Sequence, residues 1–350
     1  MSLKIGIAGI GHMGLLHLYS CLKMPNLLQV KGIAEKSTRN RKIAHQHHLK
    51  TYEDYKNLID EEELDCIIVS LPNYLKKDCV KYATDKGIDI FIDKPIARNY
   101  QEAEEMVRLV NRKGTRMMVG TNYRYHPSIE KVRKLWEEGR IGNVHLANYE
   151  LIMNGPFSHP LTPKPISEWY IDPLKAGGGA LIDLGYHLID LNVWFFGKCD
   201  VLFSDLQHVL HLPVEDASTL VLRSKKSDVV SVLNSGWFSK MIFPEFNFRV
   251  NLHGTSGFLS TDRFSPRYMR LHAVKEALKN FAKKCIGKKI DYLSYTYYYS
   301  SFFKILNDFF LAIKNGVPFS ISLDEELEVM RIIDEIYSKH LIKRGNYLNV

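Results

Sequence analysis

Short apolar segments alternate with amphipathic segments along the first part of the chain. The apolar runs have the length of strands, and the segments between them repeat their apolar residues at helical spacing. Near-continuous apolar runs are typical of strands buried on both faces of a parallel sheet. This alternation predicts right-handed βαβ units and a doubly wound sheet. The predicted strands are 4–10, 30–35, 66–71, 88–92 and 116–122, and the predicted helices are 13–24, 37–48, 74–86 and 99–113.

The pattern changes beyond residue 143, where strands follow one another along the chain. Their apolar and polar residues alternate, as expected for an antiparallel sheet with one covered face. We predict strands at 143–153, 201–208, 217–224, 228–237, 246–253 and 268–272, with helices at 127–138, 180–196, 296–314 and 324–339.

A glycine-rich segment joins the first predicted strand to the first predicted helix. It reads Gly9-Ile10-Gly11-His12-Met13-Gly14, which is the G-x-G-x-x-G pattern in the order strand, turn, helix. The first glycine permits the turn, the second lets the backbone approach a pyrophosphate, and the third lets the helix pack closely on the strand. The helix N-terminus adds unpaired N–H groups for the phosphates. The segment therefore predicts dinucleotide binding.

Together these features predict an α/β fold with two domains. Residues 1–122 are predicted to form a doubly wound Rossmann domain that binds NAD(P). Residues 123–350 are predicted to form an α+β domain with a large, mainly antiparallel open sheet, for substrate binding and oligomerisation. The C-terminal helices are free to pack back on the first domain. A length of 350 residues suits two hydrophobic cores.

The end of the second strand carries a cue to the type of dinucleotide. Glu35 stands where an acidic residue hydrogen-bonds the adenine ribose 2′-OH, and its charge repels a 2′-phosphate. NAD is therefore favoured. Lys36, Ser37 and Arg39 follow at once and are able to bind such a phosphate, so NADP remains an alternative.

Composition restricts the cellular compartment and the kinds of partner that we expect for the protein. No apolar run approaches the roughly 20 residues that span a bilayer, and no signal-peptide pattern is present. The five cysteines are widely spaced and odd in number, which favours a reducing compartment. We therefore expect a cytoplasmic protein with no membrane span, no metal site and no nucleic-acid partner.

The net charge of +8 predicts attraction to anions, which include an anionic cofactor or substrate. The densest basic group follows an amphipathic helical pattern, and we interpret it as a solvated helix face. Contact with a membrane surface or a polyanion is the alternative. The lysines of this group are Lys275, Lys279, Lys283, Lys284, Lys288 and Lys289.

Three further segments carry a resemblance to a known family. They are Asp93-Lys94-Pro95 after the fourth strand, GTNYRYHP at 120–127, and GGGALIDLGYHLID at 177–190. With them the chain resembles the Gfo/Idh/MocA family of sugar and inositol dehydrogenases over nearly its whole length. The resemblance implies Lys94, Asp183 and His187 as catalytic residues.

The chemistry of these three side chains agrees with that implication. Oxidation of an alcohol requires removal of a hydroxyl proton, and histidine is well suited to this near neutral pH. His187 follows Asp183 by four residues, so both lie on one face of the predicted helix. Lys94 stands at the carboxyl end of a strand, where open α/β sheets bind ligands. The sequence leaves open which of the three is the formal base.

The predicted sites also include departures from the family pattern. Lys76 replaces a histidine that is usual in the family, and Tyr170 replaces an arginine. Substrate binding is predicted for Lys94, Arg124, Asp183 and His187. Cofactor binding is predicted for Gly9, Gly11, His12, Met13, Gly14, Glu35, Lys36, Leu71, Pro72, Asn73, Asp93, Lys94 and Asn122.

The leading hypothesis is an NAD(P)-dependent dehydrogenase that acts on a secondary alcohol or ketone of a sugar, cyclitol or nucleotide sugar. Alternatives are a trans-dihydrodiol, imine or tetrapyrrole reductase of the same fold, and a non-catalytic dinucleotide-sensing regulatory protein. One face of the second sheet needs cover, so we expect a homodimer or homotetramer formed through that sheet.

Overall fold

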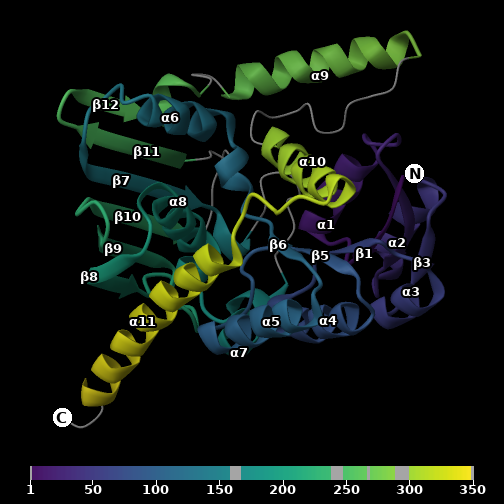
Figure 1. Cartoon of the computed structure of the whole chain (residues 1–350), viewed down its shortest axis with the longest axis horizontal. Coiled ribbons are helices and arrows are strands. Elements are labelled where there is room, and N and C mark those ends of the chain that lie inside the picture. Colours follow the sequence, from purple (N-terminus) through teal and green to yellow (C-terminus); the bar gives the residue numbers. More distant parts are fainter. Residues whose placement is uncertain (1, 158–166, 238–246, 266–268, 288–298, 348–350) are drawn as a thin grey trace.

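The computed structural model contains two six-stranded sheets with helices packed around them (Figure 1). It describes residues 2–157, 167–237, 247–265, 269–287 and 299–347. Among these residues, no helix is both long enough and apolar enough to cross a bilayer.

The first sheet is parallel throughout and has the strand order β3-β2-β1-β4-β5-β6. Its central residues are fully buried, which explains their near-continuous apolar sequence. The winding direction reverses between β1 and β4, and ligands bind at such a switch point. This confirms the predicted doubly wound sheet. The strands are β1 (Leu3–Ala8), β2 (Leu28–Ala34), β3 (Lys50–Tyr52), β4 (Cys66–Val69), β5 (Asp89–Ile92) and β6 (Met117–Val119).

Helices cover both faces of this sheet, and several begin at side chains that suit the position. Ser37, Asp54 and Asn99 each accept a backbone N–H bond at a helix start. Gly114 ends α5 in the left-handed conformation, with a φ of 73°. The helices are α1 (His12–Cys21), α2 (Thr38–Gln46), α3 (Tyr55–Glu61), α4 (Asn73–Asp85) and α5 (Tyr100–Lys113).

The second sheet has the order β12-β11-β7-β10-β9-β8. All neighbours are antiparallel except β10 and β7, which confirms the predicted mainly antiparallel sheet. The helix α8 (Tyr186–Phe196) is buried against one face. The strands are β7 (Val144–Met153), β8 (Cys199–Gln207), β9 (Ala217–Ser224), β10 (Val230–Trp237), β11 (Asn247–Gly254) and β12 (Gly257–Ser260).

The predicted strand at 268–272 was wrong. Residues from Met269 onward form the start of α9 (Met269–Cys285), because the same apolar spacing continues at helical period through the following residues. The edge of the sheet is instead β12, which pairs with β11 in a hairpin.

The predicted helix over 180–196 is helical, but its first turn is not an α-helix. Leu181–Gly185 forms a π-helical turn that leads into α8. Asp183 lies in this turn and His187 lies just after it. π turns inside helices are frequent at functional sites.

The two long C-terminal helices pack on both halves of the molecule (Figure 1). Apolar residues of α10 (Ser300–Asn315), such as Phe309 and Phe310, share one hydrophobic cluster with Ile7 and Phe91 of the parallel sheet. The helix α11 (Leu323–Tyr347) packs on both α5 and α8. The shorter helices α6 (Pro127–Glu137) and α7 (Pro173–Ala176) complete the fold.

Candidate active site

The predicted cofactor residues gather at one edge of the parallel sheet. They follow the carboxyl ends of β1, β2, β4, β5 and β6, and these ends meet along the same edge because the strands are parallel. The edge includes the switch point between β1 and β4, where open α/β sheets bind ligands.

The glycine turn between β1 and α1 has the shape of a phosphate cradle. Gly9 has a φ of 89°, and a Cβ on Gly14 would lie 2.0 Å from the carbonyl oxygen of Gly9. Both positions therefore require glycine for the backbone itself. A Cβ on Gly11 would meet no atom within 4 Å, so that side of the turn is open. Among the described residues no side chain caps the start of α1, and the first N–H groups of a helix have no partner within the helix.

Glu35 is fixed beside this turn. Its carboxylate accepts the backbone N–H groups of Ile10 at 2.9 Å and Ser37 at 2.8 Å. An acidic group therefore stands at the end of β2, next to the glycine turn. Lys36 and Arg39 lie exposed beside it. The open glycine turn and this carboxylate fit a dinucleotide whose ribose carries free hydroxyl groups.

Asp93 is buried at the end of β5 and is held by two polar side chains. Its Oδ1 lies 2.6 Å from Nε2 of His17, and its Oδ2 accepts the Ser70 hydroxyl at 2.5 Å. Sequence reasoning missed His17, because an apolar helix gives no sign of which core group a histidine will meet.

Lys76 lies beneath the turn that contains Asp93, Lys94 and Pro95. Its side chain is 1% exposed, and its Nζ donates to the carbonyl oxygens of Asp93 at 2.7 Å and Pro95 at 2.8 Å. Burial lowers the pKa of Lys76 to about 7. This residue, which departs from the family pattern, therefore supports the backbone on either side of Lys94.

Lys94 and Asp183 meet although 89 residues separate them in the sequence. The Lys94 ammonium donates to the Asp183 backbone oxygen at 2.6 Å and to its Oδ1 at 2.9 Å. The Tyr170 hydroxyl donates to Oδ1 at 2.9 Å, and Trp237 Nε1 donates to Oδ2 at 3.1 Å. The Asp183 carboxylate is thus held from three sides. The sequence indicated Tyr170 only as a replacement for an arginine of the family pattern, and it gave no sign of Trp237.

His187 completes the group. Its side chain is buried, and its ring centroid lies 4.2 Å from that of Tyr123. Burial, together with the nearby charge of Lys94, lowers the pKa of His187 well below 6.5, so the imidazole is neutral at neutral pH. Within the described part of the chain, its Nδ1 is buried and has no hydrogen-bond partner. A buried polar atom of this kind indicates a missing partner such as a ligand.

Three other predicted site residues form hydrogen bonds with protein groups outside this cluster. Arg124 is buried and binds the carboxylates of Asp190 and Glu325, with contacts as short as 2.5 Å. The side-chain amide of Asn122 donates to a serine hydroxyl at 2.9 Å. The amide of Asn73 donates to the backbone oxygen of Ala176 at 2.8 Å.

The remaining predicted cofactor residues lie along the same edge. Burial lowers the pKa of His12 to about 4, so its ring is neutral at the start of α1. Met13 packs beside Leu16 and Tyr299. Leu71 and Pro72 are half-buried in the segment between β4 and α4.

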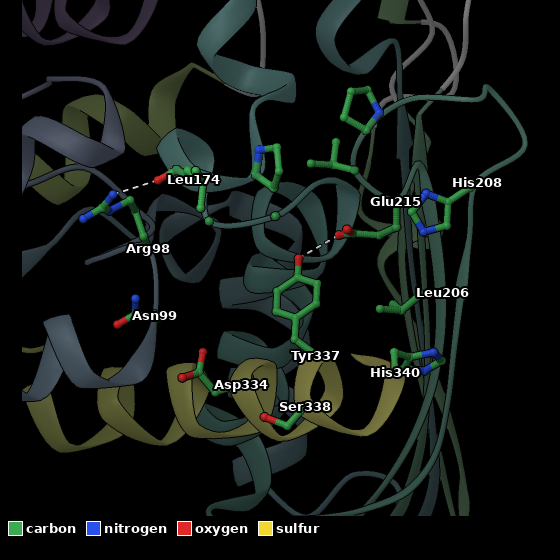
Figure 2. Close-up of a pocket in the computed structure, with 15 residues that line it drawn as sticks. Arg98, Asn99, Leu174, Leu206, His208, Glu215, Asp334, Tyr337, Ser338 and His340 are labelled. Carbon is green, nitrogen blue, oxygen red and sulfur yellow. Dashed lines mark hydrogen bonds between the residues drawn. The ribbon is translucent and has the colours of Figure 1, made fainter. Parts of the chain in front are cut away.

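A pocket of about 490 Å³ lies against the glycine loop that precedes the π turn (Figure 2). It is lined by Gly177 and Gly178, and none of the three predicted catalytic residues lines it. At its wall, the Tyr337 hydroxyl donates to the Glu215 carboxylate at 2.7 Å (Figure 2).

The buried carboxylate of Glu215 also fixes the loop itself. Its Oε1 accepts the backbone N–H groups of Gly179 at 2.9 Å and Leu181 at 3.0 Å. Glu215 thereby anchors the glycine loop and the start of the π turn that contains Asp183. Sequence reasoning missed both Glu215 and Tyr337, because these contacts join segments that are far apart in the chain.

Comparison with known proteins identifies the family. Residues 3–121 match the family described as "Oxidoreductase family, NAD-binding Rossmann fold", and residues 129–260 match the GFO/IDH/MocA C-terminal domain. The fold and the site thus define an oxidoreductase with an NAD-binding Rossmann domain. The chain belongs to the Gfo/Idh/MocA family.

Individual relatives agree with this assignment. The levoglucosan dehydrogenase of Pseudarthrobacter phenanthrenivorans is 28% identical over 67% of this chain, and the match covers 60% of that protein. Myo-inositol 2-dehydrogenase from Lactobacillus plantarum superposes with a TM-score of 0.77 at 16% identity, over 98% of both chains. Scyllo-inositol dehydrogenase from Lactobacillus casei, solved with NAD(H) and scyllo-inositol, gives a TM-score of 0.77 at 15% identity over 97% of this chain and 98% of that one.

Proposed function

We propose that this protein is an NAD-dependent dehydrogenase that transfers hydride between the nicotinamide and a secondary alcohol or ketone of a polyhydroxylated substrate. The observation that carries the proposal is the contact of the Lys94 ammonium with the Asp183 carboxylate beside a buried neutral His187. Lys94 follows the end of β5, on the edge of the parallel sheet where the glycine turn also lies, and this supports the assignment of the site.

The three side chains suit complementary roles. NAD, when bound, supplies the acceptor for the hydride. The neutral imidazole of His187 takes the hydroxyl proton of the substrate. The Lys94 ammonium stabilises the negative charge that develops on the same oxygen. The Asp183 carboxylate, held by Tyr170 and Trp237, orients Lys94 and accepts a second substrate hydroxyl.

Two features support the choice of cofactor and substrate class. The fixed Glu35 carboxylate favours NAD over NADP, because it repels a 2′-phosphate. The relatives named above act on levoglucosan and on inositols, which are compounds with several hydroxyl groups. We therefore propose a sugar, cyclitol or nucleotide sugar as the substrate.

Thermal unfolding and a substrate panel test this proposal together. NAD is expected to raise the melting temperature, because it binds only the folded state. Lys94→Ala is expected to lower turnover on a panel of polyols and sugars by at least about a thousandfold while the melting shift with NAD persists. Lys77→Ala, which removes an exposed lysine paired with Glu105, serves as the matched control.

Full turnover by the Lys94→Ala variant would remove Lys94 from the mechanism. A melting shift with NADP and none with NAD would contradict the role of Glu35.

We further propose that the protein is a homo-oligomer formed through the face of the second sheet that α8 leaves uncovered. Its central strand β10 presents Val232 there, beside Val221 on β9 and Asn148 on β7. Two such faces, each half-buried and partly apolar, would cover each other in a symmetric pair.

A further inference from the structure

The helix α9 lies at the outer edge of the molecule (Figure 1). It exposes a row of apolar side chains. The exposed fractions are 55% for Val274, 64% for Leu278 and 67% for Phe281. Their spacing of four and then three residues puts them on one face of the helix. Ile286, just beyond the end of the helix, is also 66% exposed. Exposed apolar rows of this kind mark interaction sites.

Basic residues border this row on both sides. At about 100° per residue, Lys275 and Lys279 lie along one edge of the apolar face and Lys284 lies along the other. The helix contains one acidic residue, Glu276. A solvated helix face would account for the lysines but not for the apolar row between them.

The opposite side of α9 faces the body of the protein. Asn280 is 3% exposed, and it stands roughly 120° around the helix from Val274. Lys283 lies close enough to Lys23, in the turn after α1, that its charge adds to burial in lowering the pKa of Lys23 to about 8. The buried Asn280 and the nearby Lys23 thus mark the side of α9 that faces the protein, and the apolar row lies on a different, exposed side.

We propose that α9 is a docking surface for an anionic phospholipid membrane. The helix would lie in the plane of the interface, with Val274, Leu278 and Phe281 at the boundary between headgroups and acyl chains. The flanking lysines would contact lipid phosphates. A basic polar face combined with an apolar face of Phe and Leu is typical of interfacial helices.

The charge of α9 favours a membrane over a second copy of this chain as its binding partner. Two α9 helices that paired through their apolar rows would bring two sets of flanking lysines together, and like charges at an interface oppose association. An anionic lipid surface complements the same lysines, as well as the net charge of +8.

Vesicle sedimentation of the full chain tests the proposal. The protein is expected to pellet with vesicles of equimolar phosphatidylcholine and phosphatidylglycerol, and to remain in solution with phosphatidylcholine alone or at high salt. A Leu278→Glu/Phe281→Glu double variant is expected to lower the partition coefficient by about tenfold or more. Val209→Glu changes an apolar residue outside α9 that is 68% exposed, and it should bind like the wild type.

Cys285 offers a second readout. It is the one exposed cysteine, the other four are buried, and it lies on the same face as Phe281. An environment-sensitive dye on Cys285 is expected to shift its emission to the blue with anionic vesicles only. The melting shift with NAD should persist in every variant, which shows that the fold is intact.

Three results would overturn the proposal. The first is an absence of wild-type binding to anionic vesicles. The second is equal binding to neutral and anionic vesicles. The third is a lipid-free dimer, seen by sedimentation velocity, that the Leu278→Glu/Phe281→Glu substitutions abolish.

Discussion

A lysine with almost no solvent exposure supports the turn that carries Lys94. The Nζ of Lys76 donates to two carbonyl oxygens, one on each side of that residue. Because the backbone of this turn sets the direction of the Lys94 side chain, we expect Lys76 to act on the reaction as a positioning residue. A small misplacement of a reacting group is enough to reduce the rate of an enzyme severely.

Lys76→Met tests this role. The substitution keeps an unbranched side chain but removes both hydrogen bonds, so kcat is expected to fall by about tenfold to a hundredfold. The melting shift with NAD should remain, since Lys76 lies outside the glycine turn. Lys77→Met at the exposed neighbouring position is the control. Unchanged kcat in Lys76→Met would contradict a positioning role.

The same variant reports on the protonation state of Lys76. Its pKa is about 7 in the folded protein and near 10.4 in the unfolded chain. Between these values the unfolded chain binds the proton and the folded protein does not, so this lysine makes the free energy of unfolding rise with pH. From pH 7 to pH 10, denaturant titrations should show the wild type gaining stability relative to Lys76→Met. A constant difference would mean that the buried amine keeps its proton.

The sequence indicated some of these residues and not others, for a physical reason. Lys94, Asp183 and His187 stand in motifs with fixed local spacing, so they were recognisable before the fold was known. Tyr170 and Trp237 contact Asp183 only because the π turn, β10 and the segment before α7 meet in space. Local sequence patterns cannot predict contacts between segments that are far apart in the chain.

At the scale of elements, two glycines of the β1–α1 turn are required for different reasons. Gly14 is constrained by the protein itself, because its Cβ would overlap the backbone of Gly9. Gly11 has an extended backbone with a φ of −62°, and its Cβ would stand in open space. The fold therefore tolerates alanine at Gly11, whereas a bound pyrophosphate does not.

A pair of alanine variants tests this distinction. Gly14→Ala is expected to destabilise the protein by about 1–3 kcal/mol through overpacking. Gly11→Ala should unfold at the wild-type temperature without NAD and lose at least about tenfold in NAD affinity. Differential scanning fluorimetry with and without NAD measures both effects. A normal NAD shift in Gly11→Ala would indicate that the dinucleotide does not approach this position.

Elements with a clear period were predicted best, whereas some of the short elements were missed. The βαβ rhythm and the later run of strands were strong enough to predict both sheets. β3 has three residues and α3 has seven, so each was too short for its apolar pattern to stand out from the neighbouring sequence. The π turn before α8 could not be foreseen either, because its spacing of apolar residues resembles that of an α-helix.

At the scale of the whole molecule, the described residues leave one broad face of the second sheet half-exposed. Val232 is central on that face, since β10 has neighbours on both sides. Val232→Lys is expected to convert the proposed oligomer into a monomer, because it places a charge in the middle of a symmetric contact. Analytical ultracentrifugation measures the change, with Lys226→Glu in an exposed turn as the control. A wild-type protein that is monomeric at working concentration would contradict the proposal.

The core of the parallel sheet is completed by a helix from the other end of the chain. Phe309 and Phe310 on α10 fill the cluster around Ile7, Leu18 and Phe91. During synthesis on the ribosome, the first sheet therefore emerges with part of its apolar surface bare, and that surface stays bare until roughly two hundred further residues have been translated. The nascent chain is exposed to aggregation and to chaperones throughout that interval.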